Sequence, residues 1–371
     1  IKYIWELSRC QHFTLLGEAY SLTNNEKYAI EYKNQILDWI RNNPVRYSPN
    51  WSCTMEVSIR VSNWIVSLLY FIDSITIDDE FLRIIMESIF EHGYHIRNNL
   101  ENLQSFNSNH YIADISGLFL ISIICPWLSD SNAWLRKSQR ALECEIVNQT
   151  RNDGWNHESS TAYHRLVSEF FLYTYLIGSH LNHSFSSDYT SVLKKMVLVL
   201  YDIMKPDDTF PQIGDNDSGR FLVFNHDYGN DSLNVRYMVD TSVRLDLLNF
   251  EESANISAKS YSDSGRFLYK TDILYFLLSA GPKGQMGNGG HAHNDVFSFE
   301  LNIKGRDIIV DPGTFCYTGD KKMRNSFRSI QNHNTLYWPD MEPCSLNNGL
   351  FHLAEEGKIK IISNLNIENV F

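Results

Sequence analysis

Two stretches of this 371-residue chain carry side chains that could do chemistry. The denser stretch runs from GGHAHND through VDPGTFCY to QNHNTL and contains His291, His293, Asp311 and His333. Zinc accepts imidazole nitrogen and carboxylate oxygen as ligands. In strands, residues two apart such as His291 and His293 share a face, and neighbouring strands would add Asp311 and His333. The pattern predicts a zinc site, with hydrogen-bonded histidines and a simple turn at Asp311 as the alternative.

The second stretch has polar residues at the expected starts of helices. SNHYIAD places Asn109 beside His110 ahead of an apolar run, and DGWNHESSTAYHRL contains Trp155, Glu158 and Tyr163 after a glycine turn. Amide, imidazole, phenol and carboxyl groups together are typical of proton transfer on a sugar. The alternative is packing, because a tyrosine in a helix commonly fills a core. Taken alone, these residues indicate a cleft.

The elements that must position these residues change along the chain. As far as about residue 250, apolar residues recur every three or four positions, which predicts amphipathic helices. After about residue 255 the period becomes two, as in Phe297, Phe299, Leu301 and Ile303, which predicts strands with one buried face. The sequence predicts other strands at GRFLYK, ILYFLLSAG, DIIVD, HNTLYW and KIKIIS, and a tight hairpin at KGRD. Helices followed by strands indicate two segregated domains, residues 1–255 and 256–371.

Composition excludes several classes of protein. A formal net charge of −12 disfavours nucleic-acid and anionic-membrane partners, although a local cationic cleft could still bind a polyanion. The glycine-rich GPKGQMGNGGH lacks the residues of a phosphate-binding loop, and no apolar run is long enough to cross a membrane. The six cysteines form no CxxC pair, and aromatic residues, which can stack on sugars, reach 13%. Neither end reads as a natural terminus, so we expect the natural protein to continue.

Several segments resemble the heparinase II/III family of polysaccharide lyases and its alginate-lyase relatives. They are WELSR, NPVRYSPNW, MEVSIRVSNW, SNHYIAD, DGWNHESSTAYHRL, PQIGDNDSGR, GGHAHND, VDPGTFCYTGD and RNSFRSIQNHNTL, and they span nearly the whole chain. The resemblance implies an incomplete α/α toroid followed by an antiparallel β-sandwich that is incomplete at its C-terminal end. It also implies an active site between the two domains and a periplasmic or secreted location.

The resemblance assigns catalytic roles to four residues. Asn109 matches the asparagine that neutralises the uronate carboxylate, and His110 matches a supporting residue. Tyr163 and His291 match the catalytic tyrosine and histidine, which act as base and acid. These roles imply β-elimination of an acidic, uronic-acid-containing polysaccharide. Oriented donors would stabilise the charge that develops on the carboxylate when the neighbouring proton leaves.

The resemblance also assigns binding roles. His293, Asp311 and His333 match the zinc ligands, and the zinc would organise the site rather than activate water. Residues expected to contact the substrate are Trp155, Glu158 and Arg328.

Two alternatives remain at this point. A glycoside hydrolase on an α/α scaffold would need two carboxylates, for which Glu158, Asp215 and Asp217 are candidates. A non-catalytic polysaccharide-binding protein of a surface-polysaccharide gene cluster would keep the fold without turnover. The sequence identifies neither the polysaccharide nor the oligomeric state.

Overall fold

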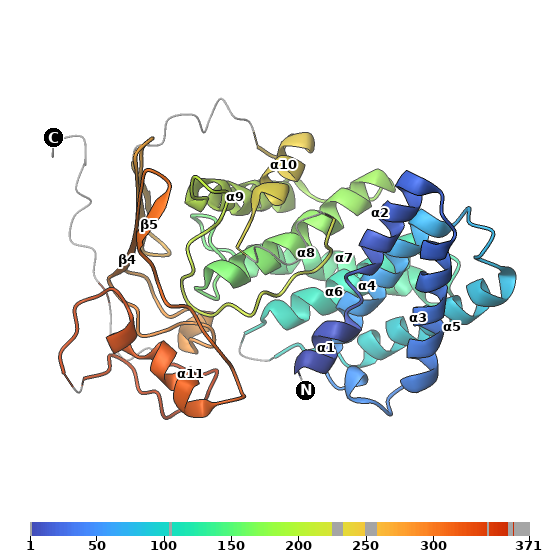
Figure 1. Cartoon of the computed structure of the whole chain (residues 1–371), viewed down its shortest axis with the longest axis horizontal. Coiled ribbons are helices and arrows are strands. Elements are labelled where there is room, and N and C mark those ends of the chain that lie inside the picture. The colour runs from blue at the N-terminus through green and yellow to red at the C-terminus, as the bar shows by residue number, and fades with distance from the viewer. Residues whose placement is uncertain are drawn as a thin grey trace. The chain divides into compact units, whose positions relative to one another are not determined.

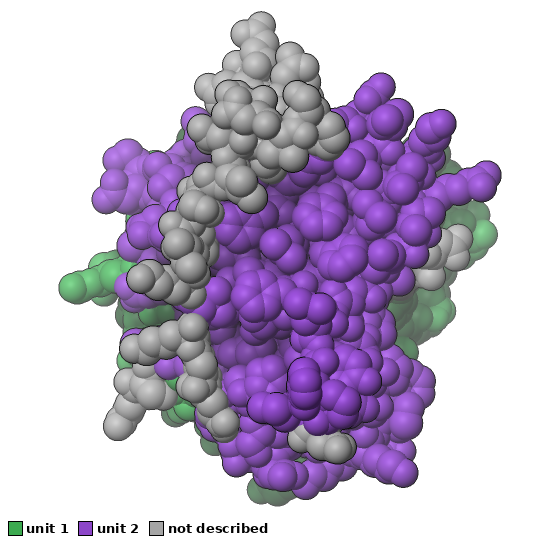
Figure 2. Space-filling view, turned by 90° about the vertical axis from the view of Figure 1, so that its left-hand side faces the viewer, with its two compact units in different colours: residues 1–145, 169–185, 220–228 green, residues 146–168, 186–219, 229–371 purple. Residues whose placement is uncertain are grey.

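The computed structural model describes residues 2–103, 106–224, 233–248, 258–339, 341–354 and 359. These residues form two compact units, which Figure 2 colours separately. Unit 1 comprises residues 1–145, 169–185 and 220–228, and unit 2 comprises residues 146–168, 186–219 and 229–371. The predicted domain boundary at residues 255 and 256 lies outside the described residues.

Helices occupy most of the chain before residue 250, as the apolar periodicity predicts (Figure 1). They are α1 (Lys2–Ser8), α2 (Phe13–Thr23), α3 (Lys27–Asn42), α4 (Thr54–Phe71), α5 (Asp79–Asn98), α6 (Asn109–Ile124), α7 (Ser131–Asn148), α8 (Thr161–His180), α9 (Ser187–Ile203) and α10 (Arg236–Arg244). The helix α11 (Lys321–Arg328) and the short 3-10 helices η1 (Pro49–Trp51), η3 (Gln285–Gly287) and η4 (Ile330–Asn332) complete the set that the structure describes.

Helix α4 forms the centre of unit 1. Nearly all of its residues are buried, so it is a core helix and not a surface helix with one apolar stripe. Gly117 of α6 lies directly against it, because a Cβ at this position would come within 2.8 Å of the Ser58 Cβ. Helix α5 is a surface helix by contrast: Asp78 caps its first turn by accepting from the Phe81 N–H (2.9 Å), and its apolar stripe faces the core.

The strands of unit 2 form one antiparallel sheet in the order β1-β2-β3-β4-β5. The strands are β1 (Ala258–Tyr261), β2 (Arg266–Lys270), β3 (Leu274–Ser279), β4 (Ser298–Ile303) and β5 (Arg306–Ile309). The hairpin predicted at KGRD is confirmed, because Ile303 pairs with Arg306 across the two-residue turn. Lys304 (φ 53°) and Gly305 (φ 75°) both have the positive φ that such a turn requires.

The face of β4 that is buried differs from the expectation. Ser298, Glu300 and Asn302 are buried, whereas the alternating residues Phe299 and Leu301 are only half-buried. Hydrogen bonds explain the reversal: Glu300 Oε1 accepts from the Gln212 N–H (3.0 Å), and Asn302 is also bonded. Polar side chains that form hydrogen bonds are buried at a smaller cost than unbonded ones. The Oδ1 atom of Asn302 is buried without a hydrogen-bond partner among the described residues.

Two other expected strands have different outcomes. HNTLYW is irregular in structure, so the prediction of a strand there is wrong. KIKIIS lies outside the described residues except for Ile359. Among the described helices, none is both long enough and apolar enough to cross a bilayer.

Candidate active site

The rings of Tyr163 and His291 stack on each other in unit 2. Their centroids lie 3.6 Å apart and the ring planes differ by 15°. Tyr163 is in the first turn of α8, where its backbone N–H donates to Ser160 Oγ (3.2 Å). His291 lies in the loop between η3 and β4. The structure therefore brings together two of the side chains predicted to be catalytic.

The carboxylate of Asp215 joins His291 to His293. Its Oδ2 accepts from His291 Nδ1 (3.0 Å) and its Oδ1 accepts from His293 Nε2 (2.8 Å). The guanidinium of Arg324 donates to both oxygens, with Nη2 2.7 Å from Oδ2. Burial alone would raise the pKa of Asp215, but the hydrogen bonds from the two histidines and the charge of Arg324 lower this pKa well below its usual value. Because an ionised carboxylate only accepts, it fixes which ring nitrogens carry the protons.

A backbone hydrogen bond also joins the segment that contains Asp215 to the loop that contains His291 and His293, called the histidine loop below. The Asp215 N–H donates to the His291 carbonyl (3.0 Å). The preceding residue, Gly214, has φ +69°, and a Cβ there would lie 2.7 Å from the same carbonyl oxygen. Glycine at this position therefore permits the close approach of Asp215 to His291.

The Tyr163 hydroxyl pairs with the hydroxyl of Tyr317 at 3.1 Å. Burial raises the pKa of Tyr163 well above its usual value of 10, and the charges of Asp217 and Asp215 raise it further. Burial and the charge of Asp215 raise the pKa of Tyr317 in the same direction. Both phenols therefore keep their protons at neutral pH, which suits them to donate rather than accept a proton.

The predicted zinc ligands cluster in unit 2. His293, Asp311 and His333 are all buried, and each offers a ligand atom within 4.8 Å of the others. His333 Nδ1 contacts Asp311 Oδ2 at 2.7 Å, so Asp311 raises the pKa of His333 even though burial acts in the opposite direction. His293 Nδ1 and His333 Nε2 are buried without a hydrogen-bond partner within the described parts of the chain.

These features fit a zinc ion. Buried ring nitrogens without a partner are costly unless they receive a ligand. His293 also donates its other nitrogen to Asp215, the arrangement that usually orients a metal-binding histidine.

The expected strand framework around this cluster is wrong. His291 and His293 lie in a loop, and His333 follows η4 instead of opening a strand. Gly284, Gly287 and Gly289 all have positive φ, which prevents a regular strand before the histidines. Both histidines reach Asp215 from this loop, so shared hydrogen bonding replaces the shared strand face.

The residues expected to contact substrate are largely enclosed. Glu158 is fully buried, and its Oε2 lies 3.5 Å from His291 Nε2. Trp155 is 2% exposed and packs in the core of unit 2. Arg328 is also buried and donates from Nη2 to the Gly349 carbonyl (2.9 Å). Of the three, Glu158 is the one placed beside the stacked pair, and substrate contact remains a prediction for all of them.

Asn109 and His110 belong to unit 1, at the start of α6. Asn109 is almost completely buried. The His110 N–H donates to the capping residue Ser108 (3.4 Å), and His110 Nδ1 lies 3.1 Å from Glu101 Oε2. The predicted meeting of these residues with Tyr163 and His291 at one sugar stays a prediction.

Sequence reasoning missed three residues of the cluster in unit 2. The sequence suggests Asp215 only as a hydrolase carboxylate and assigns no role to Arg324 or Tyr317. PQIGDNDSGR and VDPGTFCYTGD, which contain Asp215 and Tyr317, were segments of the family resemblance, and this was the available signal.

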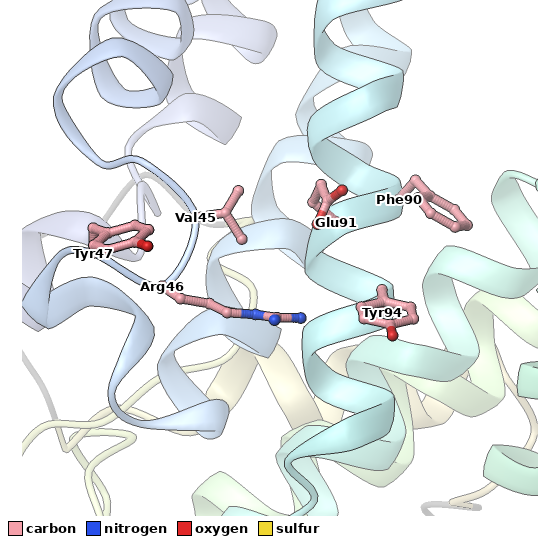
Figure 3. Close-up of a pocket in the computed structure, with 6 residues that line it drawn as sticks. All are labelled: Val45, Arg46, Tyr47, Phe90, Glu91 and Tyr94. Carbon is pink, nitrogen blue, oxygen red and sulfur yellow. The ribbon is translucent and has the colours of Figure 1, made fainter.

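A surface pocket in unit 1 contains none of the predicted site residues. Val45, Arg46, Tyr47, Phe90, Glu91 and Tyr94 line it. Figure 3 shows the Arg46 side chain extending toward α5, where its guanidinium lies 5.7 Å from the Tyr94 ring centroid. This cation–π contact accounts for the orientation of Arg46 without a ligand.

Comparisons with known proteins agree with the sequence resemblance. Residues 2–235 match the family described as Heparinase II/III N-terminus, and residues 254–362 match Heparinase II/III-like, C-terminal. The chain therefore belongs to the heparinase II/III family.

Two curated heparin-sulfate lyases are similar in sequence to most of this chain. The chain is 27% identical over 354 residues to a heparin-sulfate lyase of Pedobacter heparinus, with 90% of this chain and 51% of the relative covered. It is 25% identical over 366 residues to a heparin-sulfate lyase of Bacteroides stercoris, with 90% and 53% covered. The chain thus spans about half the length of the curated relatives it matches.

Solved structures show the fold. Heparinase III superposes with a TM-score of 0.73 at 22% identity, covering 91% of this chain and 55% of that one. The heparan sulfate lyase HepC from Pedobacter heparinus gives a TM-score of 0.62 at 26% identity, covering 91% and 54%. The predicted fold class, an α/α toroid followed by an antiparallel β-sandwich, is confirmed.

Proposed function

We propose that this chain carries the catalytic centre of a polysaccharide lyase, which cleaves uronic-acid-containing polysaccharide by β-elimination. The single observation that carries the proposal is the stacked pair of Tyr163 and His291, held on the ionised carboxylate of Asp215. Family membership and the heparin-sulfate lyases among the relatives support the same reaction class.

The reaction removes a weakly acidic proton beside a uronate carboxylate. That proton leaves only if the negative charge developing on the carboxylate is stabilised. In this proposal, Asn109 and His110 supply hydrogen-bond donors to the carboxylate. Both are at the first turn of α6, where backbone N–H groups and the helix dipole also favour an anion.

His291 suits the role of base. In the neutral tautomer that donates Nδ1–H to Asp215, Nε2 carries the lone pair that can accept the C5 proton. The imidazolium formed in this way would be stabilised by Asp215, much as a buried aspartate orients and stabilises a catalytic histidine in serine proteases.

Tyr163 suits the role of acid. Its raised pKa keeps the phenol protonated at neutral pH, so it can donate a proton to the departing glycosidic oxygen. The hydrogen bond to Tyr317 fixes the position of the hydroxyl. The lowered pKa of Asp215 disfavours hydrolysis with Asp215 as the acid, because such a carboxyl group has no proton to give at neutral pH.

The zinc site belongs to the proposal as an organising element. His293, Asp311 and His333 would hold the ion, which would supply a fixed positive charge that ties the histidine loop to the segment after β5. His293 then positions Asp215, and Asp215 positions His291.

The proposed substrate is an acidic polysaccharide, encountered in the periplasm or outside the cell. Heparin-sulfate lyases among the relatives support an acidic polymer.

A panel of uronic-acid polymers tests the proposal directly. β-Elimination creates an unsaturated uronate that absorbs in the ultraviolet, and each cleavage also creates one new chain end. Equal growth of absorbance and chain ends on at least one acidic polymer is expected. New ends without absorbance would establish a hydrolase, and binding without either product would establish a non-catalytic protein.

A further inference from the structure

Three side chains of types that can bind a metal lie close together in unit 1, far in sequence from the candidate zinc ligands. Cys53, Glu101 and His110 each offer a ligand atom, and these atoms all lie within 4.8 Å of one another. Cys53 Sγ is 3.9 Å from each Glu101 carboxylate oxygen and 3.8 Å from His110 Nδ1. His110 Nδ1 is 3.1 Å from Glu101 Oε2.

We propose that Cys53, Glu101 and His110 form a second metal site, for a divalent transition metal of the zinc class. With zinc bonds of about 2.3 Å to sulfur and about 2.0 Å to nitrogen or oxygen, tetrahedral geometry separates sulfur from either lighter atom by roughly 3.5 Å. The same geometry separates nitrogen from oxygen by roughly 3.3 Å. The observed separations of 3.8, 3.9 and 3.1 Å lie within a few tenths of an ångström of these edges.

An ion pair between Glu101 and His110 does not explain why the Cys53 sulfur lies close to both of these side chains. Cys53 Sγ is equidistant from both carboxylate oxygens and nearly as close to the imidazole, so the three groups surround a common point. Sulfur, nitrogen and oxygen together are the donor set that borderline zinc accepts, whereas magnesium and calcium select oxygen alone. The chemistry of the donors therefore selects the class of metal.

The site can be reached from solvent. The side chain of His110 is 43% exposed and that of Glu101 is 31% exposed, while Cys53 is buried beneath them. Three protein ligands with an accessible side leave a fourth tetrahedral position for water or another small ligand.

Backbone hydrogen bonds hold Glu101 close to the start of α4 and to α6. Cys53 immediately precedes α4, and the Met55 N–H at the start of α4 donates to Glu101 Oε2 (3.0 Å). The Glu101 N–H donates to Asp114 Oδ2 (2.7 Å) on α6. Contacts that fix ligands from behind in this way raise the affinity of a metal site, because less order has to be created on binding.

The position of the site gives it a consequence for catalysis. A metal bound here would tie the start of α4 and the segment after α5 to the first turn of α6, which carries Asn109 beside His110. This consequence rests on the proposed function, in which Asn109 neutralises the uronate carboxylate. Metal binding itself is independent of that role.

Cobalt(II) distinguishes this site from the candidate zinc site, which contains no sulfur ligand. The reduced, chelator-treated chain should be titrated with cobalt(II) and followed by ultraviolet and visible absorption. We expect a sulfur-to-cobalt charge-transfer band that saturates and that zinc(II) abolishes by competition. Cys53→Ser should remove the band, and Glu101→Gln should weaken cobalt binding by more than about tenfold.

Two controls make the result specific. Cys144→Ser removes an exposed cysteine of the same unit and should leave the band unchanged. A His293→Ala/His333→Ala double variant should also keep the band. Absence of the band in folded wild-type chain, or its survival in folded Cys53→Ser, would overturn the proposal. Because no substrate is used, this outcome is separate from success or failure of the lyase assay.

Discussion

Two groups of similar side chains differ in burial and in their contacts. The Asp215 cluster of unit 2 contains Asp215, His291, His293 and Arg324, and the Cys53 cluster of unit 1 contains Cys53, Glu101 and His110. Asp215 is fully buried, and two imidazoles and a guanidinium fill its acceptor positions. Glu101 and His110 are partly exposed, and the donor atoms of their cluster are spaced as metal ligands are. A buried carboxylate whose acceptor positions are all filled orients its neighbours, whereas an accessible set of converging donor atoms is suited to bind a cation.

Asp215→Asn gives the largest expected effect. The amide cannot balance the buried charge of Arg324, and removing one partner of a buried ion pair typically costs about 3–5 kcal/mol. We expect a loss of this size in the free energy of unfolding, measured by urea denaturation. Activity should fall by at least about a hundredfold, because His291 loses the group that fixes its tautomer.

The matched control is Asp240→Asn on α10. Asp240 pairs with Arg236 on the surface, and both side chains are 47% exposed. Such pairs contribute less than about 1 kcal/mol. If the two variants lose equal stability, the Asp215 cluster is no more important to the fold than a surface pair.

Tyr163→Phe should abolish most activity while preserving the fold. Removing a general acid costs roughly 10²–10⁴-fold in rate. Loss of the hydroxyl pair with Tyr317 should cost only about 1 kcal/mol of unfolding free energy. Initial rates on a cleaved polymer, together with urea denaturation, measure both effects.

Tyr317→Phe removes the same hydroxyl pair from the other side. It should match Tyr163→Phe in stability but keep activity within about tenfold, because Tyr317 only positions the acid. Full activity of Tyr163→Phe would remove Tyr163 from the mechanism.

Loss of the candidate zinc ligands should destabilise unit 2 by less than Asp215→Asn does. A ligand at a hundred times its dissociation constant stabilises the folded state by about 2.7 kcal/mol. His293→Ala should therefore lose bound metal and melt earlier than wild type, and a chelator should lower the wild-type melting temperature. Elemental analysis and thermal unfolding test this.

His180→Ala provides the control, because His180 is an exposed histidine in the last turn of α8. It should change neither metal content nor melting temperature. Unchanged metal content in His293→Ala would dismiss the site. Cobalt bound at Cys53 can be recognised by its charge-transfer band, so the two sites can be counted separately.

The sequence predicted those parts of the fold that depend on local patterns. Helices α4, α5, α8 and α9 follow from apolar spacing, and the hairpin at Lys304 and Gly305 follows from turn chemistry. The buried face of β4 could not be predicted from the alternation of apolar and polar residues. Its burial is decided by the hydrogen bond of Glu300 to Gln212, a partner 88 residues away.

The candidate site shows the same limit. Family resemblance identified Tyr163, His291 and His293, and the structure brings these three together. Asp215 was not recognised as their common partner, because it joins segments that no periodicity connects. Likewise, Cys53 is separated in sequence from His110, and no ligand spacing such as CxxC marks it.

The last test concerns acid and a buried histidine of unit 2. Burial lowers the pKa of His164 in unit 2 to about 4, although its hydrogen bond to the Met196 carbonyl acts in the opposite direction. Its Nδ1 accepts from the Asn156 N–H (3.0 Å), so the folded state holds it neutral. The unfolded chain binds this proton near pH 6.5, so stability present above about that pH is lost as the pH falls toward about 4.

His164→Gln should remove this part of the acid sensitivity, since an amide can both accept from Asn156 and donate to Met196 without titrating. Between about pH 7 and pH 4, the wild type should lose up to about 3 kcal/mol more unfolding free energy than the variant, as measured by urea denaturation. Burial and nearby arginines also lower the pKa of His95 in unit 1, to about 4, so the variant should keep some acid sensitivity. An unchanged pH profile in His164→Gln would show that His164 does not contribute to the acid response.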